Sequence, residues 1–451
     1  MKSSMFGSEA LPPGAKRAIL AGFIGFAVDF FDIYLPAIVL APVMGFFEPS
    51  GLGATTTTTI YYFTVAATLL GRPCGAVIFG HWADRIGRRR TTVVSIAGFG
   101  TLTGLIACIP GYATVGLWSL GLLLTIRFIS GVFMGGEYTS NNTLALEMVP
   151  KERRGLVGGL LQGALPMGFA AVSLVTTVML ALTTKEQYLE WGWRVPFLLG
   201  SALAFIFLVY YRTVPESTLW QEAEKSDAPL RELLAGANLR SLGQVFVMMS
   251  GFWLVVQPST ALPSIMVQHL HVSGAMTSNT FFFASIALFV CLIGWGLLGQ
   301  LIGRRRAIII AGLVELTICP LLYYAMIRHS QTGGTVLVTA VLAGTFQAMA
   351  VSPWGVATTY ICERFPTRVR ASGYGIGYSL AVVVPSFSGI YLLWLGNVMP
   401  YLLAPIVLLV IAAFLMISGS TLGPETREVE LHLPDLGRAP SPAPTAKLRS
   451  A

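Results

Sequence analysis

Long apolar stretches follow one another through almost the whole chain, and they constrain its fold more than any other feature. Twelve of them can be recognised between short polar loops, each near the roughly 20 residues that a helix needs to cross a bilayer. Of the 451 residues, 54% are hydrophobic and 11% are charged, against roughly 25% charged in soluble proteins. One soluble core could not bury so much apolar surface. The sequence therefore predicts an all-α membrane protein.

Hydropathy alone is enough to place the spans. We expect helices at about 17–45, 55–82, 92–111, 115–146, 155–183, 194–213, 241–268, 278–301, 307–328, 334–361, 370–396 and 399–420. The expected organisation is a cytoplasmic N-terminus 1–16, a six-helix bundle 17–213, a cytoplasmic linker 214–240, a second six-helix bundle 241–420 and a disordered cytoplasmic tail 421–451.

Basic residues are concentrated in alternate loops. The net charge of +8 is spread over short clusters such as Arg88–Arg90 and Arg304–Arg306, whereas the intervening loops hold little beyond Lys185 and Arg328. Nucleic-acid binding would need these charges on one solvated surface, so it is not expected. Cytoplasmic loops attract Lys and Arg, so we expect both termini in the cytoplasm and the protein in the plasma (inner) membrane.

Two motifs recur at one spacing. The loop from Gly80 to Arg90 is matched by the loop from Gly296 to Arg306, and the segment Glu147–Arg154 is matched by Glu363–Arg370. The second pair gives 363 − 147 = 216 residues, and the first pair has the same offset. Two motifs at one offset predict two pseudo-symmetric six-helix bundles of the same topology. Two such bundles around a central site are typical of an alternating-access transporter.

The loop from Gly80 to Arg90 resembles the signature loop of the major facilitator superfamily. Four further stretches, "DFFDIYLP" from Asp29, "RFISGVFMGGEY" from Arg127, "LEWGWRVPFLLG" from Leu189 and "ERFPTRVRASGYGIGY" from Glu363, together resemble the metabolite:proton symporter family. The resemblance implies uptake of small carboxylates or zwitterions with protons. The chain departs from the family pattern at Asp29-Phe30, where Glu-Trp is usual. It also has Gln300 where its own first half has Asp84.

Few ionisable side chains lie at membrane depth, and each needs a partner or an aqueous cavity. Asp29 and Asp32 share one face of the first span through their i, i+3 spacing. Neighbouring carboxylates do not both ionise readily, so we expect Asp32, coupled to Asp29, to hold the transported proton. Glu137 is a further relay candidate. Arg72 is expected to form a structural ion pair; the alternative for the aspartates is a static network with Arg72 or Arg127.

An anionic substrate needs fixed positive charge, and arginine binds a carboxylate with two hydrogen bonds. Arg127 and Arg194 are the candidates, and the resemblance implies a functional role for both. The alternatives are a buried ion pair for Arg127 and, for Arg194, an interfacial position beside Trp191 and Trp193. Further side chains expected to line the cavity, or simply to pack between helices, are Tyr34, Gln162, Trp253, Gln257, Trp354, Tyr374 and Tyr378.

The repeated loops also suggest a gate. Glycines allow tight turns, and Asp84 can bind an arginine or a helix N-terminus, which would hold the cytoplasmic side closed. A topology signal alone would need neither Asp84 nor Gly87. The expected gating residues are Gly80, Asp84, Arg85, Gly87, Arg88, Glu147, Arg154, Glu363 and Arg370.

These features predict proton-coupled uptake of a small mono-, di- or tricarboxylate by a monomeric transporter in the lipid bilayer. A zwitterion symporter, in which Asp29 and aromatic rings hold the cation, and a proton-driven exporter remain alternatives. No catalytic motif indicates an enzyme, and no filter-like loop indicates a channel. No cofactor or metal is expected.

Overall fold

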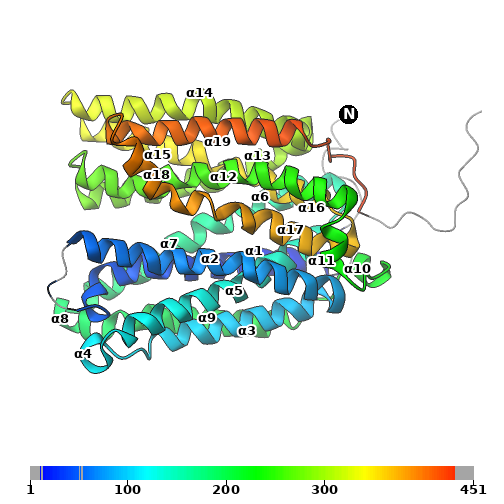
Figure 1. Ribbon diagram of the computed structural model, residues 1–451, viewed down its shortest axis with the longest axis horizontal. Coiled ribbons are helices and arrows are strands. Elements are labelled where there is room, and N and C mark those ends of the chain that lie inside the picture. Colours follow the sequence, from blue (N-terminus) through cyan, green and yellow to red (C-terminus); the bar gives the residue numbers. More distant parts are fainter. Residues whose placement is uncertain (1–10, 12–13, 50, 52–53, 432–451) are drawn as a thin grey trace, which may run out of the picture.

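The computed structural model describes residues 11, 14–49, 51 and 54–431, and it is built from helices (Figure 1). Ten described helical segments are long and apolar enough to cross a membrane. Two further long helices, α2 (Ala54–Ile86) and α3 (Arg88–Ile106), pack against α5 (Trp118–Glu147) and bring the spans to 10 + 2 = 12. The predicted all-α, twelve-helix membrane fold is confirmed.

The two halves of the chain form two layers. In Figure 1 the blue-to-cyan helices of the first half lie below the green-to-red helices of the second half. The other helices of the first half are α1 (Ala15–Leu35), α4 (Tyr112–Val115), α6 (Lys151–Gln162), α7 (Ala164–Leu182), α8 (Lys185–Gln187) and α9 (Arg194–Tyr211). The second half holds α12 (Gly236–Gln268), α13 (Gly274–Ile302), α14 (Arg304–Gln331), α15 (Val336–Val351), α16 (Trp354–Glu363), α17 (Arg370–Ser379), α18 (Ser388–Leu395) and α19 (Ala404–Thr421).

Several spans are interrupted near their middles. The fifth span breaks at Gly163, between α6 and α7, and the tenth breaks at Ser352-Pro353, between α15 and α16. The eleventh leaves α-helical geometry after Ser379 and passes through two 3₁₀ turns before α18. Proline removes a helical N–H donor, so Pro353 and Pro385 explain two of these breaks. In transporters, interrupted helices usually surround the binding site.

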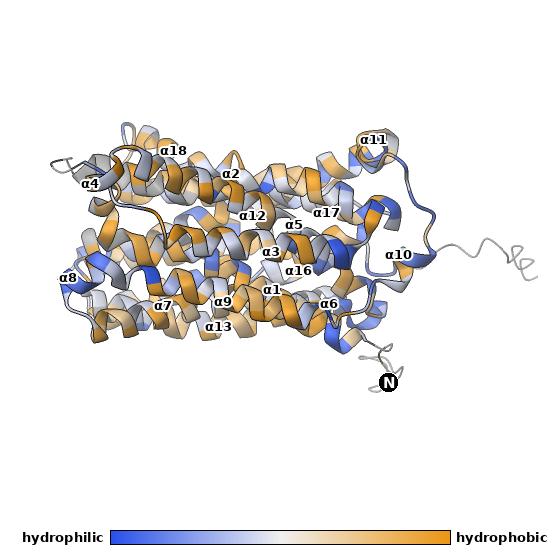
Figure 2. Ribbon diagram, turned by 90° about the horizontal axis from the view of Figure 1, so that it is seen from below, coloured by the Kyte–Doolittle hydropathy of each residue, from blue (hydrophilic) through white to orange (hydrophobic). Residues whose placement is uncertain are grey.

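Polar residues gather at the two ends of the bundle, while its middle is mostly apolar on the outside (Figure 2). We call the end that carries Arg88–Arg90 and Arg304–Arg306 the arginine-rich end. The segment between the bundles lies there and contains two short helices, α10 (Thr218–Glu222) and α11 (Pro229–Leu233). Helix α12 begins at Gly236, five residues before the expected bundle boundary at 241.

The start of the C-terminal tail differs from the sequence-based expectation of disorder. Residues 422–431 pack against the arginine-rich end. Thr426 Oγ1 donates to Glu363 Oε2 at 2.7 Å, and the backbone carbonyl of Val429 accepts a hydrogen bond from Arg154 at 2.8 Å. Proline and charge content suggested a disordered segment, but buried acceptors and donors of the bundle bind it. The tail beyond 431 lies outside the described residues.

Candidate functional site

Two buried ion pairs join helices of the N-terminal bundle at membrane depth. Asp29 on α1 pairs with Arg72 on α2, with Oδ2 and Nη2 3.1 Å apart. One helical turn along α1, Asp32 pairs with Arg127 on α5 at 3.0 Å, and Thr103 on α3 donates to its second oxygen. All four charged side chains are at most 2% exposed. The i, i+3 spacing places both aspartates on one side of α1, where each pairs with an arginine of a different helix, the arrangement given above as the alternative to a proton carrier.

Arg127 and Arg72 differ in how many of their N–H groups donate hydrogen bonds. Arg127 donates through Nη1 to the Asp32 carboxylate and through Nη2 to the Asp32 backbone oxygen, at 3.0 and 3.1 Å, and among the described residues its Nε has no acceptor. Arg72 donates to Asp29 through Nη2, whereas its Nε and Nη1 have no hydrogen-bond acceptor among the described residues. Its guanidinium lies 4.6 Å from the centre of the Tyr138 ring. Arg72 therefore has donors to offer a ligand.

The carboxylates differ in the same way. Both oxygens of Asp32 are bonded, to Arg127 and Thr103. In Asp29 the Oδ1 atom has no partner among the described residues, and neither has Oε2 of Glu137. Glu137 lies on α5 and accepts from Asn141 Nδ2 at 2.7 Å. Asp29 and Glu137 thus have lone pairs available to a proton or a water molecule.

Buried aromatic rings from both bundles pack together beside Arg72. Tyr138 belongs to the N-terminal bundle, and its ring centre lies 5.0 Å from that of Tyr378 on α17. Tyr378 in turn lies 5.5 Å from both Trp253 and Trp354, which are themselves 4.9 Å apart. Tyr374 stacks on Tyr378 at 5.9 Å. These five rings, the aromatic cluster, connect the charged helices of one bundle to the interrupted helices of the other.

Most of the polar residues predicted to line the cavity lie at or near the interface between the bundles. Gln162 Nε2 donates to Thr358 Oγ1 across the interface, and Trp354 and Tyr378 belong to the aromatic cluster. Gln257 accepts from Ser388 at 3.0 Å within the C-terminal bundle. Tyr34 packs on Phe169 in the N-terminal bundle, with ring centres 5.0 Å apart.

Arg194 lies apart from these residues. Its guanidinium stacks on Phe46 and Trp193, 5.4 and 5.2 Å from the ring centres, at the end opposite the arginine-rich end. This is the interfacial arrangement that the neighbouring tryptophans suggested, and the structure does not bring Arg194 into contact with Arg72 or Arg127. Substrate binding by Arg194 stays a prediction without a supporting contact.

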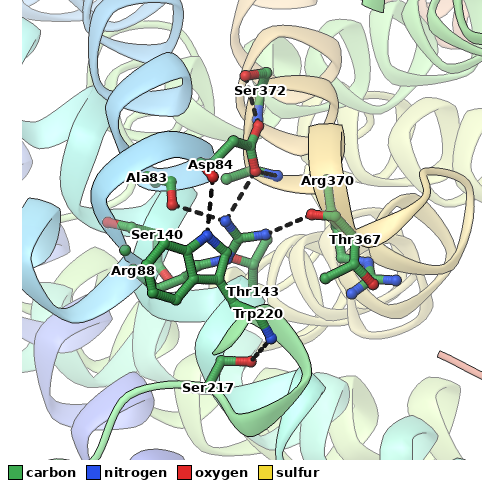
Figure 3. A network of polar contacts seen from close by, with 12 residues as sticks. Ala83, Asp84, Arg88, Ser140, Thr143, Ser217, Trp220, Thr367, Arg370 and Ser372 are labelled. Atoms are coloured by element: carbon green, nitrogen blue, oxygen red, sulfur yellow. Dashed lines mark hydrogen bonds and ion pairs between the residues drawn. The ribbon is translucent and has the colours of Figure 1, made fainter. Parts of the chain in front are cut away.

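A first network closes the arginine-rich end between α2 and α17 (Figure 3). Asp84 accepts from the backbone N–H groups of Ala371 and Ser372 at 3.0 and 2.8 Å, and from the Ser372 hydroxyl at 2.7 Å. It also pairs with Arg88 at 2.9 Å. Glu147 accepts from Arg88 at 3.3 Å and from Arg370 at 2.8 Å. We call Asp84, Arg88, Glu147 and Arg370 the Asp84 latch.

A second network joins α6 to α13 and α16. Gln300 accepts from the backbone of Gly155 at 3.0 Å and from Arg304 at 2.8 Å. Glu363 pairs with Arg304 at 3.3 Å and with Arg154 at 3.8 Å. We call Gln300, Arg304, Glu363 and Arg154 the Gln300 latch. Each member lies 216 residues from its counterpart in the Asp84 latch, taking Arg154 with Arg370.

The glycines of the signature loop have clear steric roles. A Cβ atom on Gly80 would lie 2.9 Å from the Ser372 Cα, so glycine lets α2 approach α17. Gly87 has φ +114°, a conformation that favours glycine, and begins α3. Arg85, in contrast, is exposed and forms none of the latch contacts, so a gating role for it stays a prediction.

Sequence reasoning missed two acids that bind the starts of α3 and α14. Glu216 accepts from the backbone N–H groups of Arg88 and Arg89, and Glu425 accepts from those of Arg304 and Arg305. Burial raises the pKa of the Glu216 carboxyl, against the opposing effect of the N–H groups that donate to it. A signal was present: each acid follows a proline shortly after the last helix of its bundle, as Pro215-Glu216 and Pro424-Glu425.

Comparison with known proteins identifies what this arrangement is similar to. The model of the family described as "Sugar (and other) transporter" matches residues 18–241. The inner membrane metabolite transport protein YhjE of Escherichia coli is 29% identical, over 82% of this chain and 85% of that protein. The alpha-ketoglutarate permease of the same organism is 31% identical, over 81% and 83%. The structure of the proton:xylose symporter XylE matches with a TM-score of 0.74 at 18% identity, over 91% of this chain and 96% of that one.

Proposed function

This chain belongs to the major facilitator superfamily of transporters, and from that premise we propose that it takes up a small organic acid together with protons. It is a multi-pass inner-membrane transporter and not an enzyme. We place the arginine-rich end in the cytoplasm, because loops rich in Lys and Arg stay on that side. The two latches then close the cytoplasmic side of the substrate pathway.

The observation that carries the proposal is the Asp29–Arg72 pair. Among the described residues, Oδ1 of Asp29 and the Nε and Nη1 atoms of Arg72 have no hydrogen-bond partner. Protonation of Asp29 would remove the charge that holds Arg72 Nη2, and the guanidinium could then turn its planar fork to a substrate carboxylate. Release of the substrate would return Arg72 to Asp29 and expel the proton. One proton and one anion would thus bind together and leave together at one site, which couples their transport in the same direction.

The sequence favours Asp32 as the proton carrier, but the contacts of its side chain favour another role. Both of its oxygens and both Nη groups of Arg127 are bonded within the N-terminal bundle. Freeing either side chain would leave a buried charge without a partner, at a cost of about 3–5 kcal/mol. We therefore propose that Asp32 and Arg127 hold α1 against α5, and that Asp29 titrates, with Glu137 as a relay.

The alternatives are less well supported by the contacts. A zwitterion symporter would need Asp29 beside an aromatic face to hold the cation, but Asp29 is paired with Arg72, and Arg72 itself stacks on Tyr138. A proton-driven exporter of hydrophobic compounds would need an apolar binding site, whereas Arg72 lies beside the aromatic cluster with Nε and Nη1 unpartnered among the described residues. Both remain outcomes of the uptake test below.

The test uses purified protein in liposomes that enclose a pH-sensitive dye, with lactate, alpha-ketoglutarate, citrate and glycine betaine added outside in turn. We expect at least one carboxylate to drive proton entry. Asp29→Asn mimics the protonated form, so it should exchange that carboxylate across the membrane but not drive proton entry. Asp32→Asn serves as the comparison. Proton entry that survives in Asp29→Asn, or that follows betaine alone, would contradict the proposal.

A further inference from the structure

The aromatic cluster lies where four interrupted or tightly packed helices meet. Trp354 is the first residue of α16, directly after the break at Ser352-Pro353, and Tyr378 is the second-last residue of α17, before its 3₁₀ turns. Both rings are at most 2% exposed. Helix breaks let side chains move without unwinding a whole span. The cluster can therefore open by local movement next to Arg72.

Buried polar atoms without partners surround these rings. Within the described residues, hydrogen-bond partners are lacking for Trp354 Nε1, Asn142 Oδ1, Gln162 Oε1 and the Nε and Nη1 atoms of Arg72. Each of these side chains is at most 2% exposed. Buried donors and acceptors are almost always bonded in proteins, to the protein itself, to water or to a ligand. A ligand, or water in its absence, would complete the hydrogen bonding of these atoms.

The fixed charges around this place limit the charge of the ligand. The N-terminal bundle supplies two bases at membrane depth, Arg72 and Arg127, against three acids, Asp29, Asp32 and Glu137. The described spans of the C-terminal bundle carry Lys or Arg only near their ends. A monocarboxylate that arrives with one proton leaves the total charge unchanged. Each further negative charge would enter without a free cation, which is costly at this depth.

The cluster also limits the shape of the ligand. Arg72 stacks on Tyr138, Tyr138 packs on Tyr378, and Tyr378 packs on Trp354, so a guanidinium leads directly into a row of rings. A carboxylate at Arg72 would place the rest of the molecule against Tyr378 and Trp354. Flat rings offer little to a flexible polar chain, but they stack on another ring.

We infer that the transported acid is a monocarboxylate whose body is a ring, held by Arg72 through its carboxylate and by Trp354 and Tyr378 through its face. This inference rests on the proposed function and narrows it: open-chain acids and di- or tricarboxylates are poor substrates. Trp354 Nε1 is then the donor for a hydroxyl or a second polar group on the ring.

Matched ligands separate charge from shape. The probes are 3,4-dihydroxybenzoate, terephthalate, 6-hydroxyhexanoate and succinate, applied to dye-loaded proteoliposomes and, for binding, in calorimetry with the detergent-solubilised protein. Protein-free liposomes measure passive entry of each acid. We expect 3,4-dihydroxybenzoate to drive proton entry. Terephthalate has the ring but carries a second negative charge. It should bind at least about fiftyfold more weakly than 3,4-dihydroxybenzoate. The open-chain 6-hydroxyhexanoate should bind about tenfold more weakly.

Two variants test the ring contact. Trp354→Leu should weaken 3,4-dihydroxybenzoate binding about tenfold, while Trp354→Phe keeps a ring and should recover most of it. Neither change should alter the weak binding of 6-hydroxyhexanoate. Succinate or 6-hydroxyhexanoate driving proton entry as well as the ring acid would overturn the inference and leave the proposed function standing. If none of these acids, and none of the open-chain acids above, drives proton entry, the proposed function itself is rejected.

Discussion

The two latches occupy equivalent places in the two repeats, yet they hold the bundles together by different means. The Asp84 latch contains two acids and two arginines, so its charges balance, and Asp84 binds two backbone N–H groups of the other bundle. The Gln300 latch contains one acid and two arginines, and Gln300 binds one such group. The Asp84 latch therefore provides the stronger closure, and both latches are assisted by neighbouring segments.

Those neighbouring segments are also matched. In the segment after α19, the Val429 carbonyl accepts a hydrogen bond from Arg154. Glu428 and Glu430 form ion pairs with Lys151 on α6 of the other bundle. In the first repeat, Glu232 on α11 pairs with Arg368 in front of α17. Each bundle thus ends in a segment that crosses to the other. Chain outside the spans thus supplements both latches, and in the second repeat it contacts an arginine of the latch itself, Arg154.

The largest effects are expected when a latch loses its glutamate, as in Glu147→Gln. This change leaves Arg88 and Arg370 buried with one acid between them, and should cost about 3–5 kcal/mol of stability in the closed state. Thermal unfolding in detergent measures it. The matched change, Glu363→Gln, should cost more, because it removes the one acid of the Gln300 latch and leaves Arg304 and Arg154 buried without a carboxylate, whereas Arg88 keeps Asp84. Equal losses would mean that the two latches do not differ as described.

Asp84→Asn should have the next largest effect. The amide keeps one acceptor but loses the charge that binds two N–H groups and Arg88, a loss of about 2 kcal/mol. The balance should shift about thirtyfold toward the state open at the arginine-rich end. Spin labels at the exposed residues Arg85 and Arg368 report the distance across this end. An unchanged distance distribution would show that Asp84 does not hold it closed.

Gln300→Glu should act in the opposite direction. The substitution keeps the length of the side chain and gives the second latch two acids for two arginines, like the first. The hydrogen bond that it accepts from the Gly155 N–H becomes charge-assisted and its contact with Arg304 becomes an ion pair, which should stabilise closure by about 1 kcal/mol and slow turnover. Transport rates in proteoliposomes check this. A faster rate would mean that opening of this latch does not limit the cycle.

The smallest effect is expected from Lys151→Gln. The Lys151 side chain is 29% exposed and that of Glu430 is 53% exposed, so water screens their attraction. Melting temperature and transport rate should both be unchanged. Truncation after Gly423 is the informative companion, since it also removes Glu425 from the start of α14 and Val429 from Arg154. A larger loss on truncation than in Lys151→Gln would show that the buried contacts hold the tail.

The residues of the two latches could largely be predicted from the sequence, but their pairing could not. The 216-residue offset relates Asp84 to Gln300, Arg88 to Arg304, Glu147 to Glu363 and Arg154 to Arg370. In the structure the acid of each Glu-to-Arg segment pairs with the arginine of the other segment: Glu147 with Arg370, and Glu363 with Arg154. A repeat indicates which residues are equivalent. It does not tell which copy a side chain faces, because that depends on how the bundles dock.

At the central site, too, the sequence identified the residues and the fold decided their pairing. Sequence placed Asp29, Asp32, Arg72 and Arg127 at membrane depth, because charged residues stand out in apolar spans. Pairing depends on helix rotation, and only the fold assigned Asp29 to Arg72 and Asp32 to Arg127. The same holds for the aromatic cluster, whose members were candidates individually but whose packing across two bundles was not foreseeable.

The sequence by itself determined the class of this protein, its spans, its internal repeat and its superfamily resemblance, because the bilayer acts on every residue of a span and leaves its mark in composition and spacing. Tertiary structure alone decided which of Arg72 and Arg127 keeps an Nη group without a partner among the described residues, which acids cross between the bundles and where the tail packs. Those outcomes depend on distances of a few ångströms between side chains far apart in the chain. Hydropathy and spacing contain no such information.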